Sequence, residues 1–312
     1  MKILIFGRGA IGTQYAWAFE KAGHDVEFYV RPGRKEQYGA YVNLETQDGR
    51  RKKNKRISEK WPVELREEIA PNAQYDLVFL SVNTEQVKKA VEYLAPRIGN
   101  ATVLFFNNFG GDAQKAVAPI PVEQVVFGFP GAGGGYEGNT LYGIMYKTVQ
   151  LGLVNATPSE RELAVQKLFE EAGFRISVQK DIRSWLLNHY VMNTAMEAEV
   201  LKHGSFENVV LSSGALADMI RNIKEMIPYL KAKKVPMDMA MKMFGIIPPR
   251  LFGHLLQKTM YAKGSMAYEA IAHNHFKAGY AVKEIVSDAR KLGVLLPRLE
   301  AALDYAKNEK QV

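Results

Sequence analysis

Three glycines near the start of the chain have the spacing that binds the phosphates of a dinucleotide. Gly7, Gly9 and Gly12 form a G-x-G-x-x-G motif directly after the apolar residues 3–6. In such a motif the first glycine makes a tight turn, and the second lets the backbone approach a pyrophosphate. The third allows a helix to pack closely on the preceding strand. The chemistry predicted here is therefore phosphate binding.

The elements around the motif place it where a nucleotide site needs it. Residues 3–6 predict a buried parallel strand, and apolar residues at helical spacing follow the glycines. Ala10 and Ile11 would begin this helix, where free N–H groups and the helix dipole favour negative charge. Residues 26–30 predict a second strand. We therefore expect Ala10 and Ile11 to bind the cofactor with the three glycines; a glycine turn without a ligand is the alternative.

The residue after the second predicted strand selects the cofactor. An NAD site usually has Asp or Glu there, about 20 residues beyond the glycines. This chain has Arg31, followed by Arg34 and Lys35. A guanidinium would pair with the 2′-phosphate of NADP, which a carboxylate would repel. The sequence therefore favours NADP over NAD. The alternative is that these basic residues form a solvated loop that binds no phosphate.

Two asparagines follow later strands of the predicted sheet. Residues 75–82 and 102–106 predict strands, and Asn83 and Asn108 come after them. Ligands of doubly wound sheets lie outside the carboxyl ends of the strands, so both asparagines are expected to bind the cofactor, with Asn108 near the nicotinamide. For Asn108, a turn asparagine bonded to its own backbone is the alternative. The glycine-rich residues 129–146 predict a loop between two strands.

Strand signals end near residue 180, and long helical patterns follow. We expect an α/β fold with an N-terminal Rossmann-like doubly wound parallel sheet in residues 1–180 and an all-helical domain in residues 181–312. On the first long helix Trp185, His189 and Asn193 share one stripe. Because this stripe is otherwise apolar, the polar pair needs partners, which a substrate or the neighbouring backbone can supply.

Charge and composition exclude several other classes of protein. The net charge is +8, and residues 50–56 carry six of the basic side chains. This tract follows a turn signal and predicts a solvated hairpin tip. The alternative is a phosphate-binding patch, but no aromatic residues alternate with the charges as a nucleic-acid surface would require. The chain has no cysteine, which excludes disulfides and thiolate metal sites.

Targeting and metal signals are also missing from the sequence. We find no signal peptide and no apolar run of about 18 residues, so we expect a cytoplasmic protein that does not span a membrane. His273 and His275 are two residues apart without an acidic cluster, and on a helix they would point to different faces. We therefore expect no metal site.

The chain resembles the ketopantoate reductase family along nearly its whole length. The resemblance rests on GRGAIG at the N-terminus, Arg31 after the second strand, the turn NNFGG, the segment AGFRISVQKDIRSWLLN before the long helix, and ARKLGVLLP near the end. It implies an NADP-binding domain, a helical domain and a substrate cleft between them. The family transfers hydride from NADPH to a 2-keto acid, giving the 2-hydroxy acid needed for pantothenate synthesis. Apolar helices in the second domain are compatible with a homodimer.

The chain departs from this family at the catalytic positions. Members usually carry a lysine two or three positions after a tryptophan, followed by asparagines at helical spacing. Here Trp185 is followed by residues 186–188, which include no lysine. The family's glutamate near the C-terminal helix also has no clear match, since Lys277 lies near the expected place and Glu284 two turns further on.

His189 is the nearest titratable group that could replace the lysine. An unperturbed pKa of about 6.5 suits proton donation at neutral pH. We expect His189 to be the general acid and Asn193 to orient a 2-keto acid substrate. Two alternatives stay open: a reductase of a different carbonyl substrate, and a catalytically silent NADP-binding sensor.

Overall fold

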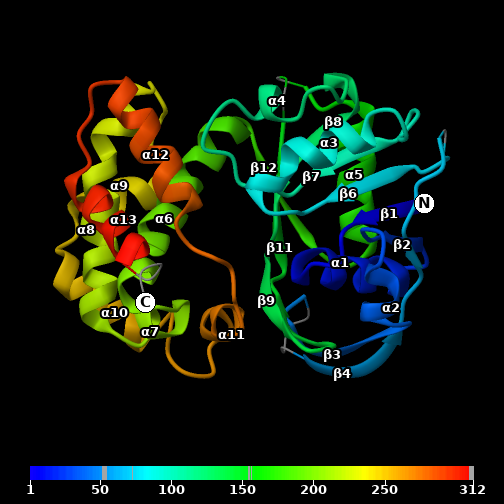
Figure 1. Ribbon diagram of the computed structural model, residues 1–312, viewed down its shortest axis with the longest axis horizontal. Coiled ribbons are helices and arrows are strands. Elements are labelled where there is room, and N and C mark those ends of the chain that lie inside the picture. The colour runs from blue at the N-terminus through cyan, green and yellow to red at the C-terminus, as the bar shows by residue number, and fades with distance from the viewer. Residues whose placement is uncertain (51–54, 72, 154, 156, 309–312) are drawn as a thin grey trace. The chain divides into compact units, whose positions relative to one another are not determined.

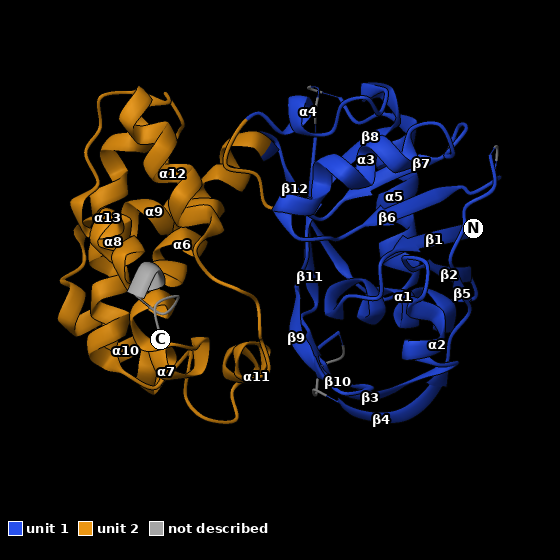
Figure 2. Cartoon of the chain, viewed as in Figure 1, with its two compact units in different colours: residues 1–107, 112–182 blue, residues 108–111, 183–312 orange. Residues whose placement is uncertain are grey.

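The structure is a computed structural model that describes residues 1–50, 55–71, 73–153, 155 and 157–308. The chain forms two compact units, which Figure 2 colours blue and orange. The first unit contains Met1–Asn107 and Asp112–Ile182, and the second contains Asn108–Gly111 and Arg183–Val312. The short segment 108–111 therefore belongs to the helical unit, although it follows a strand of the first.

The first unit is built on a large sheet flanked by helices (Figure 1). Within the described residues this sheet has eight strands in the order β12-β11-β8-β7-β6-β1-β2-β5. Its strands are β1 (Lys2–Phe6), β2 (Asp25–Tyr29), β5 (Leu65–Arg66), β6 (Leu77–Leu80), β7 (Thr102–Phe105), β8 (Val125–Phe129), β11 (Thr148–Gly152) and β12 (Arg175–Gln179). Its helices are α1 (Ala10–Lys21), α2 (Arg34–Tyr38), η1 (Thr84–Gln86), α3 (Val87–Leu94), α4 (Ala113–Ala116), η2 (Val122–Gln124) and α5 (Glu160–Glu171).

The strand order confirms the doubly wound sheet. Strands β5-β2-β1-β6-β7-β8 pair in parallel, and the chain winds outward in both directions from β1. The carboxyl ends of β1 and β6 thus form the point where strand order reverses, which is where such sheets bind ligands. The sheet is not wholly parallel, because β11 pairs antiparallel with β8.

A second sheet corrects the prediction of a glycine-rich loop at residues 129–146. It has the order β4-β3-β10-β9, formed by β3 (Tyr41–Asp48), β4 (Lys55–Pro62), β9 (Ala132–Glu137) and β10 (Thr140–Met145). Glycine at position 143 leaves room for the Gln14 side chain of α1 against this hairpin. A Cβ on Gly143 would lie 2.7 Å from Oε1 of Gln14, and the Gln14 amide donates to the carbonyl of Gly133 at 3.0 Å.

The basic tract starts at Arg50, which is not a solvated residue. Its guanidinium pairs with Asp48 at 2.8 Å and donates to the carbonyl of Ala172 at 2.6 Å. It also lies over the rings of Trp17 and Phe174 at 5.3 and 5.1 Å. The predicted hairpin of β3 and β4 is present, but Arg50 is tied to the body of the unit. Residues 51–54 of the tract lie outside the described residues.

The second unit contains helices and no strand within its described residues, as the sequence predicted. The helices are α6 (Ile182–His203), α7 (Phe206–Val210), α8 (Ser213–Ala232), α9 (Met239–Ile246), α10 (Pro249–Lys258), α11 (Met266–Ala272), α12 (Tyr280–Lys291) and α13 (Pro297–Asn308). Side-chain oxygens of Ser205, Ser212, Asp238 and Ser265 cap α7, α8, α9 and α11. Each capping oxygen accepts one of the N–H groups that a helix start leaves unpaired.

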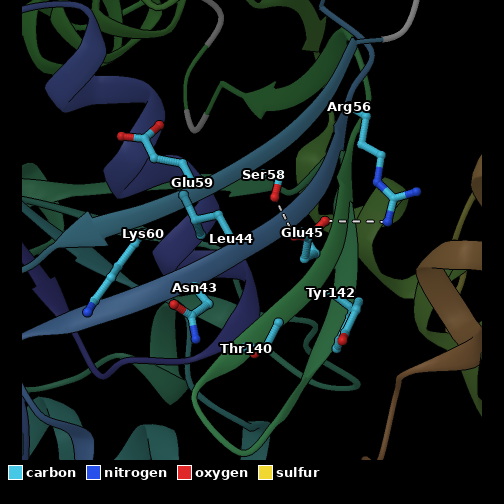
Figure 3. Close-up of a pocket in the computed structure, with 9 residues that line it drawn as sticks. All are labelled: Asn43, Leu44, Glu45, Arg56, Ser58, Glu59, Lys60, Thr140 and Tyr142. Atoms are coloured by element: carbon cyan, nitrogen blue, oxygen red, sulfur yellow. Dashed lines mark hydrogen bonds and ion pairs between the residues drawn. The ribbon is translucent and has the colours of Figure 1, made fainter.

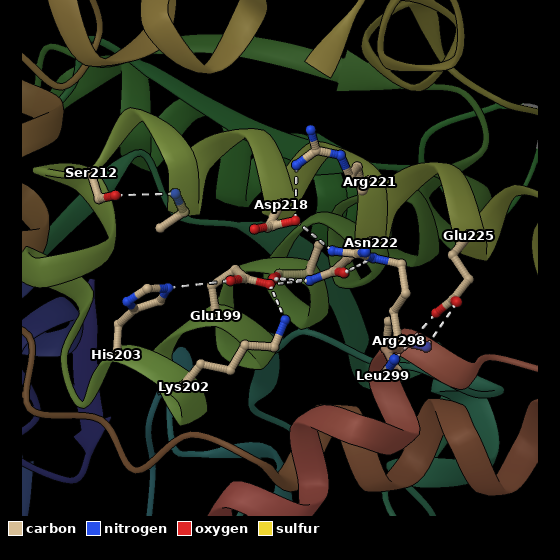
Figure 4. A network of polar contacts seen from close by, with 12 residues as sticks. Glu199, Lys202, His203, Ser212, Asp218, Arg221, Asn222, Glu225, Arg298 and Leu299 are labelled. Carbon is tan, nitrogen blue, oxygen red and sulfur yellow. Dashed lines mark hydrogen bonds and ion pairs between the residues drawn. The ribbon is translucent and has the colours of Figure 1, made fainter. Parts of the chain in front are cut away.

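A partly buried polar network ties α13 to the centre of this unit (Figure 4). Arg298 donates to Asn222 Oδ1 at 2.9 Å and to Asp218 at 2.7 Å. Asn222 is fully buried and donates to Glu199 at 2.7 Å. The carboxylate of Glu225 accepts from the first amides of α13. These bonds satisfy polar groups that would otherwise be costly to bury.

Candidate functional site

The glycine loop has the backbone geometry that its spacing predicts. Gly7 has φ of +95°, a left-handed conformation that suits a turn without a side chain. Gly9 is the exposed N-cap of α1, and no side chain caps this helix. A Cβ on Gly12 would lie 2.9 Å from Cγ2 of Ile5 in β1, so glycine permits the close approach of helix and strand. Ala10 and Ile11 form the first turn of α1 and are half-buried.

The loop after β6 lies beside the glycine loop. A Cβ on Gly9 would be 3.8 Å from the carbonyl oxygen of Ser81. Asn83 is exposed and precedes η1 as its N-cap residue. Asn107, which the sequence did not predict as a site residue, is 3% exposed and donates to the carbonyl of Val82. Its position at the end of a predicted strand was the signal that could have identified it.

Arg31 lies in the loop between β2 and α2 and is exposed. Its carbonyl accepts from the amide of Arg34 at 3.0 Å, which makes a tight turn there. Arg34 donates to Gln37 at 2.6 Å, and the amide of Lys35 donates to Glu67 at 2.8 Å. Among the described residues no carboxylate forms an ion pair with Arg31, so its guanidinium can take an external anion.

The predicted stripe on α6 is present. The rings of Trp185 and His189 stack with centroids 5.2 Å apart and planes 6° apart. His189 and Asn193 are both half-buried. Burial lowers the pKa of His189 to about 4. At pH 7 this leaves about one ring in a thousand protonated. A neutral imidazole can still donate one N–H hydrogen bond.

Tyr190 and Glu284, which the sequence analysis did not link, hold the turn that carries Asn108. The Tyr190 hydroxyl donates to Glu284 of α12, and burial together with this carboxylate raises the pKa of Tyr190. A Cβ on Gly110 would lie 2.4 Å from Cε1 of Tyr190 and 3.0 Å from Oε2 of Glu284. Asn108 is half-buried within this turn, and Lys277 is exposed between α11 and α12.

Other features of the described residues do not assemble into a site. His273 is the C-cap of α11 and His275 lies beyond that helix. No cluster of three potential metal ligands occurs in the part of the chain that the structure describes. In the same part, no helix has the length and apolar character needed to cross a membrane.

A pocket of about 570 Å³ opens on the second sheet (Figure 3). It is lined mainly by polar side chains of β3, β4 and β10, and no predicted site residue is among them. Within it Ser58 and Arg56 both contact Glu45, at 2.5 and 3.4 Å. These side chains satisfy one another, so the pocket is a polar surface of the sheet and not a candidate active site.

A doubly wound sheet with a G-x-G-x-x-G loop at its switch point, together with a helical second unit, defines a Rossmann-type protein. Residues 3–152 match the family model described as ketopantoate reductase PanE/ApbA. A 2-dehydropantoate 2-reductase of Vibrio cholerae serotype O1 is 26% identical over 119 residues, which is 38% of this chain and 35% of that relative. The part of the chain that contains the glycine loop is therefore similar to the ketopantoate reductase family.

Solved structures share the fold at low sequence identity. A D-mandelate dehydrogenase determined with NADH and anilino(oxo)acetate is 17% identical, with a TM-score of 0.74 and coverage of 100% of this chain and 98% of that one. A 2-dehydropantoate 2-reductase from Geobacter metallireducens GS-15 is 16% identical, with a TM-score of 0.70 and coverage of 99% and 100%. At these identities the comparison establishes the fold, so residue roles must be argued from this chain.

Proposed function

We propose that this protein is an NADP-dependent oxidoreductase that reduces a 2-keto acid, 2-dehydropantoate or a similar compound, to the 2-hydroxy acid. The observation that carries the proposal is the glycine loop at the N-terminus of α1. Gly7 turns the loop with a φ of +95°, and Gly9 has no side chain. The loop therefore leaves room for a pyrophosphate, and a Cβ on Gly9 would reduce that room. The N-terminus of a twelve-residue helix favours this anion. The residues present therefore fit a dinucleotide.

Residues of the first unit, together with Asn108, would hold the cofactor. The amides near Gly9, Ala10 and Ile11 would bind the pyrophosphate, and Gly7 and Gly12 keep the turn and the helix in place. Arg31 would pair with the 2′-phosphate, which supports NADP over NAD. Asn83 and Asn108 are assigned to the nicotinamide end, as donors and acceptors for its ribose. When bound, the cofactor supplies the hydride.

The residues of α6 would act on the substrate. A ketone that receives hydride becomes an alkoxide, which needs a hydrogen-bond donor or a proton. Because the pKa of His189 is about 4, its neutral ring would donate an N–H bond to this oxygen, and water would supply the proton. His189 would thus act as a neutral hydrogen-bond donor and not as the general acid expected from the sequence. Asn193, one turn further on, would orient the substrate.

The test is oxidation of NADPH and of NADH by the purified protein with a panel of 2-keto acids. Turnover with 2-dehydropantoate and a preference for NADPH are expected, and no turnover with any acid would contradict the proposal. Aromatic 2-keto acids belong in the panel because the D-mandelate dehydrogenase neighbour was determined with NADH and an oxoacetate. A preference for these acids would favour a reductase with a different substrate, and cofactor binding without turnover would favour a sensor.

Assembly and cellular role follow the same proposal. A dimeric ketopantoate reductase from Staphylococcus aureus shares the fold, with 12% identity and a TM-score of 0.67. We propose a homodimer in the cytoplasm that takes part in pantothenate biosynthesis, without nucleic-acid or membrane partners. Analytical ultracentrifugation should give about twice the chain mass of 35.0 kDa. A monomer at micromolar concentration would contradict the dimer.

A further inference from the structure

Arg8, the second residue of the glycine motif, is a buried cation without an acidic partner. Its side chain is 8% exposed. Its guanidinium carbon lies 4.6 Å from the ring centroid of Tyr38 and 4.9 Å from that of Tyr136. One terminal nitrogen donates to Oδ1 of Asn139. Among the described residues Arg8 forms no ion pair, and its buried Nε has no hydrogen-bond partner.

Neutral groups hold this guanidinium in a fixed orientation. The Asn139 amide donates to the carbonyl of Tyr41 at 2.8 Å, so its oxygen faces Arg8. The Tyr136 hydroxyl donates to Thr13 of α1 at 2.9 Å. Burial raises the pKa of Tyr136 to about 12, so its ring faces Arg8 as a neutral phenol. The stacking and the single amide bond therefore orient the charge without neutralising it.

Burying a charge without a counter-charge is costly, and an anion would offset that cost. Aromatic rings offset part of it, and an oxygen anion that accepts from the guanidinium would offset more. Asn139 accepts from one terminal nitrogen, and Nε of Arg8 is still unpartnered. The site is thus complementary to a phosphate.

The neighbours of Arg8 indicate which phosphate this is. Tyr38 ends α2, the helix that follows β2. In doubly wound sheets the end of the second strand lies beside the adenosine ribose, whereas the pyrophosphate lies on the first helix N-terminus. Arg8 contacts the helix after β2, and so lies toward the adenosine end of the predicted cofactor. The phosphate at that end of NADP is the 2′-phosphate.

We propose that Arg8 is a specificity-determining residue that binds the 2′-phosphate of NADP together with Arg31, an inference that rests on the proposed nucleotide site. Arg31 is exposed, whereas Arg8 is buried and already oriented by Asn139. A charge-assisted bond is stronger where water is excluded, and less side-chain freedom is lost when the donor is fixed beforehand. Arg8 therefore contributes more to the discrimination between NADP and NAD than Arg31 does.

The test measures binding of two adenosine nucleotides by calorimetry, so it does not depend on catalysis. Adenosine 2′,5′-bisphosphate carries the 2′-phosphate and 5′-AMP lacks it. Arg8→Met should weaken the bisphosphate about ten- to a hundredfold and change 5′-AMP less than about twofold. Arg31→Met should weaken the bisphosphate by a smaller factor. The control is Arg161→Met, because Arg161 bonds Asn100 and Thr102 at the amino end of β7.

Each other outcome overturns the inference. Equal weakening of both nucleotides would place Arg8 at the 5′-phosphate or in the architecture of the loop, and no change would make it purely structural. If Arg8→Met fails to fold, Arg8→Lys is the second variant, because it keeps the positive charge but lacks the planar guanidinium. Arg8→Lys should lose part of the preference for the bisphosphate over 5′-AMP. An unchanged preference would refute the role of Arg8 in binding the 2′-phosphate. A wild-type protein that binds neither nucleotide would refute the proposed function itself, and equal affinity for both would refute only the NADP preference.

Discussion

The charge state of His189 can be tested through the stability of the protein. The pKa of this residue is about 4 in the folded chain because burial penalises the imidazolium, against 6.5 for an unperturbed histidine. Between about pH 4 and pH 6.5, His189 therefore binds a proton in the unfolded chain but not in the folded chain. The contribution of His189 is fully present above pH 6.5 and is lost as the pH falls through 6.5 toward 4. The loss between pH 8 and pH 5 is about 2 kcal/mol, approaching about 3 kcal/mol at lower pH. Because the ring is half-buried, these values are upper limits.

The assay is urea unfolding at pH 8, 7, 6 and 5, comparing the wild-type protein with His189→Phe. Phenylalanine keeps a flat ring against Trp185, whose ring stacks on His189 at 5.2 Å, but it cannot titrate. Burial also lowers the pKa of His24, and this effect cancels in the difference because both proteins contain His24. The wild-type protein should lose about 2 kcal/mol relative to the variant between pH 8 and pH 5. Parallel curves, within about 0.5 kcal/mol, would show that His189 titrates normally and would restore it as a general acid.

Two further perturbations test the helical unit. Gly110→Ala should destabilise the chain by about 1–3 kcal/mol and reduce kcat/KM, because its Cβ would lie 2.4 Å from Tyr190. The adjacent Gly111→Ala has nothing within 4 Å of its Cβ and serves as the control; equal effects in urea unfolding and turnover assays would refute the close contact. Arg298→Ala should cost about 1–3 kcal/mol in urea unfolding, since it removes two bonds from a partly buried network and leaves the buried Asn222 without one of its partners. Arg290→Ala breaks an exposed ion pair of 3.0 Å and should cost less than about 1 kcal/mol, so a larger loss than for Arg298→Ala would contradict this ranking.

Elements that depend on local sequence were predicted well. The first strand, the glycine turn and α1 follow from an apolar run and three glycines within twelve residues. Helix α8 spans Ser213–Ala232, with Ser212 as its capping residue, within the part of the chain expected to be helical. In these segments the hydrophobic period, the cap and the breaker residues all lie within a few turns of one another. Such signals do not depend on the rest of the chain.

Features that depend on distant partners were missed. The hairpin of β9 and β10 is rich in glycine, which is depleted in strands, and it packs against Gln14 of the distant helix α1. Arg8 and Asn139 are 131 residues apart, and Tyr190 and Glu284 are 94 apart. No pattern among residues that are close in the sequence indicates either of these contacts. Arg50 was expected in solvent for the same reason, since Ala172 accepts its hydrogen bond from 122 residues away.

The proposed nucleotide site on α1 and the proposed catalytic site on α6 depend on different properties of the sequence. The proposed phosphate binding at the N-terminus of α1 would use backbone amides, so the requirement appears in the sequence as glycine at fixed spacing. The proposed stabilisation of an alkoxide by α6 would require a donor in a defined protonation state. That state depends on how far His189 is desolvated, which its residue type does not specify. The lysine usual in this family would carry a full charge at neutral pH, whereas a histidine with a pKa of about 4 offers only a neutral N–H. If His189 acts as proposed, kcat should therefore stay flat from pH 6 to pH 8, where an imidazolium acid would titrate.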